Sequence, residues 1–169
     1  MLKKIFFEIF VMIILAGIFL SCGRYAVPEF ENADVLAQDL YADVGFDVSG
    51  VYKETLDTKS AYLIGLSSDE FDDTVEDAVI YRKMIDSDGQ TLYVLKMKTE
   101  DAAKSVAEDY YSRYEWAACD NAEKLIVACA GRYLLCFKSN SEDADTVLES
   151  FKSLAGGTLS YHKERINKS

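Results

Sequence analysis

The densest group of side chains with a capacity for chemistry is a run of six carboxylates within residues 69–77 (DEFDDTVED). Calcium and other hard cations are bound by several oxygen atoms, so this segment is a candidate cation site. Calcium-binding loops place a glycine at a fixed position, however, and this segment contains none. We therefore expect a solvated, acid-rich loop or helix N-terminus here, and no bound metal or other cofactor.

Thiols are the second group, and three cysteines follow Cys22 in the chain: Cys119, Cys129 and Cys136. Their spacing matches no Cys-x-x-Cys metal or redox motif, and no neighbouring base would activate any of them. We expect buried apolar thiols, with a Cys119–Cys129 disulfide as the alternative. An odd number of cysteines in an exported protein leaves at least one thiol unpaired or in an intermolecular bond.

Aromatic side chains that could stack on a sugar or a peptide gather near residue 113. At helical spacing, Tyr110 and Tyr114 belong to the buried stripe of a helix, which leaves Tyr111 and Trp116 as candidate contacts for a ligand or partner. His162 is the single histidine of the chain, so most histidine-based catalysis and most zinc sites are excluded. We assign no catalytic residue.

Cys22 is the residue whose flanking sequence predicts a defined modification. Lys3 and Lys4 precede a 12-residue uncharged run, Ile9–Leu20, which as a helix would span about 18 Å, less than the roughly 30 Å of a bilayer core. Residues 1–21 are therefore expected to be a signal peptide. Ser21-Cys22 resembles a bacterial lipobox, in which cleavage after Ser21 exposes Cys22 for diacylation on sulfur. Phe19 and Leu20 depart from that pattern, so an uncleaved anchor and ordinary secretion are the alternatives.

Composition narrows the class of protein. Removal of residues 1–21, with a net charge of +1, would leave 148 of the 169 residues and change the net charge from −11 to −12. This charge excludes a nucleic-acid-binding footprint and electrostatic docking on anionic lipid. Eleven tyrosines and nine phenylalanines argue against a wholly disordered chain.

Hydrophobic periodicity predicts the elements of one domain over residues 32–157, between a tether at residues 22–31 and a polar tail at residues 158–169. Helices are expected from Asn32 to about Val44, after Thr99, and from Ser141 to the glycines at 156 and 157. Residues 45–57 are expected to be a loop, and residues 58–66 a short helix or a strand, with the helix preferred. Hairpins are expected over residues 78–98 and 124–138.

These elements predict an α+β fold, preceded by an N-terminal helix: an antiparallel sheet of about four strands from two β-hairpin–helix units, with helices on one face. The motif Glu-Asp-Ala recurs at residues 100–102 and 142–144, which indicates either a duplication or two units that obey the same capping rules. The unbroken apolar run Leu125–Ala130 predicts a central strand that is buried on both faces.

The segments VIYRKM, LYVLKMKTEDAAKSVAEDYYSRY and AGRYLLCFKS, with the lipobox and a short leading helix, resemble a family of Gram-positive lipoproteins catalogued as domain of unknown function 4358. The resemblance covers roughly residues 32–155. Its motifs are a strand with Lys96 and Lys98, a helix that ends near Arg113, and Gly131-Arg132-Tyr133 at the start of a buried strand. Residues 119–121 depart from it, because a proline is expected there. The resemblance implies a lipid-anchored surface protein with no assigned chemistry.

We therefore expect a non-enzymatic lipoprotein, attached through Cys22 to the outer face of the cytoplasmic membrane, that binds a protein or small ligand and no nucleic acid. An envelope hydrolase that uses paired carboxylates and a structural subunit of a membrane complex are the alternatives. A cleft above about 300 Å³ with convergent carboxylates would favour the enzyme. A flat exposed aromatic patch would favour a partner surface.

Overall fold

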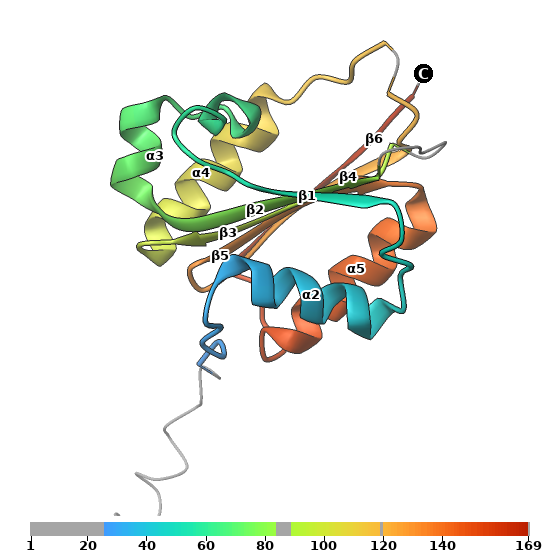
Figure 1. Ribbon diagram of the computed structural model, residues 1–169, viewed down its shortest axis with the longest axis horizontal. Helices are drawn as coiled ribbons and strands as arrows, with labels where there is room; N and C mark the ends of the chain where they lie inside the picture. The colour runs from blue at the N-terminus through green and yellow to red at the C-terminus, as the bar shows by residue number, and fades with distance from the viewer. Residues whose placement is uncertain (1–25, 84–88, 119, 169) are drawn as a thin grey trace, which may run out of the picture.

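A six-stranded antiparallel sheet forms the centre of the domain, as a computed structural model of residues 26–83, 89–118 and 120–168 shows (Figure 1). The strands are β1 (Val51–Thr55), β2 (Val75–Lys83), β3 (Thr91–Met97), β4 (Lys124–Ala130), β5 (Tyr133–Ser139) and β6 (Tyr161–Ile166). They lie in the order β1-β2-β3-β5-β4-β6. The helices are α2 (Ala33–Val44), the 3₁₀ turn η1 (Ala61–Ile64), α3 (Ser68–Thr74), α4 (Glu100–Arg113) and α5 (Ser141–Leu154).

The two predicted hairpins are present and form the middle of the sheet. In β4, all seven residues are buried, which confirms the central strand expected from its unbroken apolar run. Val127 lies opposite Cys136 across the β4–β5 pair, as the turn at Gly131 predicts. Gly131 has a φ of 53°, in the left-handed region that a tight turn requires and that glycine adopts at no steric cost.

Helices cover both faces of the sheet, so the expectation that they lie on one face is wrong. Figure 1 shows α2 and α5 on one side and α3 and α4 on the other. Strand β3 shows why, because Leu92 and Val94 pack against the α2/α5 layer, while Leu95 and Met97 pack against the α4 layer. A sheet that is apolar on both faces must be covered on both.

The sheet has six strands rather than about four, because both edge strands come from segments expected to be irregular. β1 lies within residues 45–57, which were expected to form a loop, and β6 lies within residues 158–169, expected to be a polar tail outside the domain. Both are largely exposed, with sequences (VYKET and YHKERI) that lack an apolar run. Polar, charged edge strands are common because charge discourages pairing with other chains, and such strands escape a search for apolar patterns.

The predicted helices are confirmed, with the N-cap of α5 corrected from Ser141 to Asn140. Asn32 caps α2 and Thr99 caps α4, as expected. The 3₁₀ turn η1 lies within residues 58–66, where a short helix was preferred. Among the described residues, no helix has the length and apolar character needed to cross a membrane.

The two hairpin–helix units do not form a symmetric repeat. A twofold rotation normal to the sheet would superpose the β2–β3 hairpin on the β4–β5 hairpin and leave both helices on the same face. Instead α4 and α5 lie on opposite faces (Figure 1). The architecture therefore favours shared capping rules over a simple duplication as the origin of the repeated Glu-Asp-Ala motif.

Phe151 tests the packing of α5, because its side chain is fully buried between this helix and the sheet. We expect Phe151→Ala to lower the free energy of unfolding by about 3–5 kcal/mol, since it removes a large apolar contact and leaves a cavity. Urea denaturation measures the change, and Lys152→Ala on the same helix is the control. A loss below about 1 kcal/mol, in the range of ordinary surface substitutions, would show that α5 is not packed in this way.

Candidate functional site

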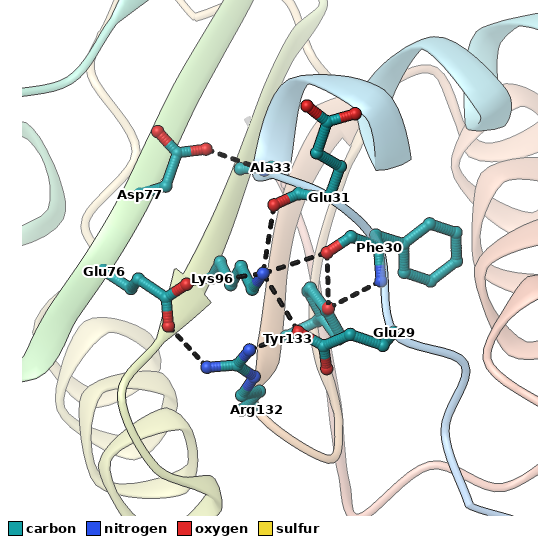
Figure 2. Close-up of polar contacts among 9 residues, drawn as sticks. All are labelled: Glu29, Phe30, Glu31, Ala33, Glu76, Asp77, Lys96, Arg132 and Tyr133. Atoms are coloured by element: carbon teal, nitrogen blue, oxygen red, sulfur yellow. Dashed lines mark hydrogen bonds and ion pairs between the residues drawn. The ribbon is translucent and has the colours of Figure 1, made fainter.

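A buried ammonium group at one end of the sheet organises the site. Lys96 is only 4% exposed. Its Nζ lies 2.9 Å from the carbonyl oxygen of Phe30 and 3.1 Å from that of Glu31, to which it donates hydrogen bonds. Two carboxylates complete its surroundings, with Glu29 at 3.0 Å and Glu76 at 3.3 Å (Figure 2).

Arg132 and Tyr133, at the β4–β5 turn, add a second set of contacts to the same segment. The guanidinium of Arg132 forms ion pairs with both Glu29 and Glu76. The hydroxyl of Tyr133 accepts a hydrogen bond of 2.9 Å from the amide of Phe30, whose ring meets that of Tyr133 edge-on at 5.3 Å. We refer to the group formed by Glu29, Phe30, Glu31, Glu76, Lys96, Arg132 and Tyr133 as the N-terminal clasp.

The strands bring these side chains together through cross-strand pairing and one irregularity. Lys96 of β3 lies directly opposite Tyr133 of β5. In β2 the pairing with β3 shifts between Val75 and Asp77, so Glu76 is an extra residue in a β-bulge. Figure 2 shows Glu76 directed toward Lys96 and Arg132, and Asp77 directed toward the start of α2, where it accepts a 2.7 Å hydrogen bond from the amide of Ala33. The bulge thus places two adjacent carboxylates at the clasp, one against its cations and one against the backbone of Ala33.

The charges of the clasp stabilise one another. Burial alone would lower the pKa of Lys96, but its hydrogen bonds to Glu29 and Glu76 outweigh this effect and the pKa is raised. Hydrogen bonds from Arg132 and Lys96 lower the pKa of Glu29. Lys96 therefore stays protonated with its hydrogens directed at oxygen atoms, so it has no lone pair for nucleophilic or base catalysis. The chemistry of the clasp is attachment of residues 29–33 to the sheet.

The clasp corrects the expectation that residues 22–31 are a simple tether. The described part of this segment packs on the domain, with Val27 and Phe30 against the core between the sheet and α2/α5. In the sequence, Lys96 was placed only in the strand motif of the family resemblance and not in a site. Its signal was a lone charge inside the apolar strand LYVLKM, where alternation places it in the interior.

A second buried ammonium group fastens the other edge of the sheet. Lys124 is 7% exposed and pairs with Asp145 of α5 and, at 2.7 Å, with Glu164 of β6. The same Glu164 lies 3.0 Å from Nε2 of His162. His162, expected in the tail, is therefore in the last strand, where its contact with Glu164 lies within β6.

Tyr111 and Trp116, the candidate contact residues, are half-buried and engaged within the domain. The Tyr111 hydroxyl donates a 2.9 Å hydrogen bond to the carbonyl of Glu164, and the guanidinium of Arg165 lies 4.6 Å from its ring centre. Trp116 packs edge-on against Tyr114 at 5.2 Å. The structure thus places both residues on the α4 side of the sheet, where Tyr111 holds β6 and Trp116 packs on Tyr114.

Of the cysteines singled out from the sequence, the structure describes two. Cys129 and Cys136 are free, buried thiols, as expected, so Cys129 does not form the alternative disulfide. Burial raises the pKa of Cys129 to about 12 and that of Cys136 well above its usual value, which makes both unreactive. Ser21, Cys22 and Cys119 lie outside the described residues.

The acidic run at residues 69–77 contains a helix N-terminus, one of the two structures expected for it. Ser67 and Glu70 form a capping box at the start of α3, which uses one carboxylate of the run. Within residues 26–83, 89–118 and 120–168, no cluster of three or more potential ligands could hold a metal ion.

A groove of about 440 Å³ lies between β1 and η1, lined by Glu54, Asp57, Lys59, Ser60, Tyr62, Leu63 and Arg82. The charges of its four charged side chains sum to zero. Tyr62 is 72% exposed, and the buried Nε of Arg82 has no hydrogen-bond partner among the described residues. An exposed ring with donors and acceptors nearby is suited to binding a polar ligand. This groove was not predicted from the sequence, because β1 lies in a segment expected to be a loop.

A scan of family models and searches of curated proteins and of solved structures each give no match. Site assignments therefore rest on the geometry of this chain.

Glu29→Gln tests the electrostatics of the clasp. Because the folded-state pKa of Glu29 lies below its ordinary value of 4.5, this carboxylate stabilises the fold above that pH, and the contribution is lost as the pH falls through the lowered pKa. We expect Glu29→Gln to lower the melting temperature by a few degrees at pH 7, and by progressively less below pH 4.5.

The matched control is Glu31→Gln, whose carboxylate points away from Lys96 in Figure 2. It should leave the melting temperature unchanged at every pH. Equal melting of Glu29→Gln and the wild type at pH 7 would contradict the role given to Glu29. Thermal scans followed by circular dichroism from pH 3 to pH 8 measure both variants.

Proposed function

We propose that this protein is a lipoprotein that is diacylated at Cys22, after cleavage behind Ser21, and displayed on the outer face of the cytoplasmic membrane of a Gram-positive bacterium. Its folded domain is a non-enzymatic binding module. Membership of the lipoprotein family that the sequence resembles is part of the same proposal. The N-terminal clasp is the observation that carries it.

The clasp supports the proposal because of its place in the chain. The buried Lys96, the guanidinium of Arg132 and the Tyr133 hydroxyl hold residues 29–31, which begin seven residues after Cys22. In a domain that carries a lipid at its N-terminus, this segment connects the anchor to the fold. A buried charge is costly unless it is fully paired, so its use to fix such a short segment favours a role for the segment in holding the domain on its anchor.

Binding is favoured over hydrolysis by the state of the carboxylates. The groove exceeds the roughly 300 Å³ expected of a ligand cleft and contains Glu54 and Asp57. Asp57 accepts hydrogen bonds from the hydroxyl and amide of Ser60, which lower its pKa. Glu54 forms an ion pair of 3.8 Å with Arg82. A carboxylate-based glycosidase needs one acid whose pKa is raised, whereas the pKa of Asp57 is lowered.

Lipid attachment is tested with Cys22→Ala. We expect this variant to remain unprocessed, without the mass of the acyl chains, because the acceptor thiol is absent; globomycin should likewise block processing of the wild type. Mass spectrometry of the purified protein and fractionation of cells measure both effects. An unchanged size and membrane association after substitution and after globomycin would show that Cys22 is not the attachment point.

The groove is tested by crosslinking in intact cells. A photo-crosslinking amino acid at Tyr62 should capture a ligand or protein at a yield that Arg82→Ala lowers several-fold, since Arg82 supplies donors to the groove. The same probe at Ser112, exposed on α4, is the control. Equal products from both sites would contradict a binding role for the groove, and capture of an integral membrane protein would favour the structural-subunit alternative.

A further inference from the structure

We infer that the end of the domain formed by the β4–β5 turn, the start of α4 and the C-terminus of α5 is its membrane-facing surface, with the lipid bilayer as its partner. This inference rests on the proposed lipid attachment at Cys22. It names which surface meets the bilayer, and thereby which surface points outward.

The short length of chain between Cys22 and the folded domain limits how far the domain can lie from the membrane. Four Cα–Cα steps separate Cys22 from Ala26, where the described chain begins, and they span at most about 15 Å however residues 23–25 run. Were residues 22–32 free up to the start of α2, eleven steps would allow about 42 Å. The packing of Val27 on the domain, together with the clasp that follows it, therefore reduces the reach of the anchor to well under half of that length.

The contacts of the clasp also fix the place at which the chain that leads to Cys22 leaves the domain. Residues 29–33 are held by side chains from three strands: Asp77 of β2, Lys96 of β3 and Tyr133 of β5. Val27 packs on the β4–β5 turn so closely that a Cβ at Gly131 would lie 3.2 Å from its side chain. The segment that leads to Cys22 thus leaves the domain beside this turn.

Electrostatic attraction does not supply this orientation. The membrane-facing surface carries exposed acids at Asp72, Asp73, Glu100 and Asp101, and the net charge of −12 calculated for residues 22–169 opposes an anionic leaflet. Removal of the lipid should therefore abolish membrane contact, and removal of the clasp should loosen the orientation without releasing the protein.

The opposite end of the domain therefore points away from the membrane. Figure 1 shows the C-terminus there, at the far end of the sheet from the start of α2. The loop before β1, with Val48 exposed, lies at that end as well. Because strands of seven residues span about 23 Å, the two ends differ in height above the bilayer by roughly that distance.

The repeated Glu-Asp-Ala motif provides two matched labelling positions. Glu100 and Glu142 are both exposed first-turn residues, but α4 starts at the membrane-facing end and α5 at the other, because β3 and β5 are antiparallel. Each is changed to cysteine in the diacylated full-length protein with Cys119→Ser, then labelled with a donor dye. The protein is placed in phosphatidylglycerol–phosphatidylcholine vesicles that carry an acceptor on a lipid headgroup.

We expect energy transfer from position 100 to be at least about twofold stronger than from position 142, given the separation of the two ends. Lys96→Met and, as a milder variant, Arg132→Gln should move this ratio toward one. Lys98→Met, at the same strand end but outside the clasp, should leave it unchanged. Circular dichroism and melting curves establish that each variant is folded.

Each outcome decides the inference. Equal transfer from the two positions of a protein whose diacylated Cys22 is verified by mass spectrometry would overturn the orientation while leaving the lipid anchor intact. A ratio that survives both folded clasp variants would overturn the role of the clasp. A bare Cys22 in protein purified from its host would overturn the proposed function and the orientation together.

Discussion

The arrangement of this protein depends on an ammonium group that is almost entirely withdrawn from water. Lys96 is placed in the interior by the alternation of β3, so its charge must be met by oxygen atoms of the protein. Two of these are backbone carbonyls of Phe30 and Glu31. The residues that precede the first helix are therefore a structural part of the fold, and Glu29, Glu76 and Arg132 follow from the same need for charge balance.

The same principle recurs at the edge of the sheet that β6 forms. Lys124 is buried against α5 and is neutralised by Asp145 and Glu164, while Arg165 on the opposite face of β6 donates to the carbonyl of Tyr111. The segments at residues 26–32 and 161–166 are thus each attached by charged side chains in addition to the apolar contacts of Val27, Phe30 and Tyr161. Apolar burial builds the interior, and ion pairs fasten the segments that border it.

The parts of the fold foreseen from sequence are those with strong local signals. The periodicity of α2, α4 and α5, the caps Asn32 and Thr99, and the turn at Gly131 are encoded in a few neighbouring residues. The strand β6 and the groove were missed because edge strands are polar. The clasp was missed because it joins residues up to 103 positions apart, as in the contact of Phe30 with Tyr133. The second helical layer was also missed, because the sequence alone does not show which face of the sheet each helix covers.

The position of β6 has a consequence for how the chain comes to be folded. Its partner β4 is buried along its whole length, yet one edge of β4 is completed only by residues 161–166, which follow it after β5 and α5 along the chain. A polypeptide that emerges from a ribosome or a secretion channel with its N-terminus first exposes that edge until residues 161–166 have emerged. Completion of the sheet therefore waits for β6, and a product that stops before residue 161 would display an unpaired apolar strand to quality-control proteases.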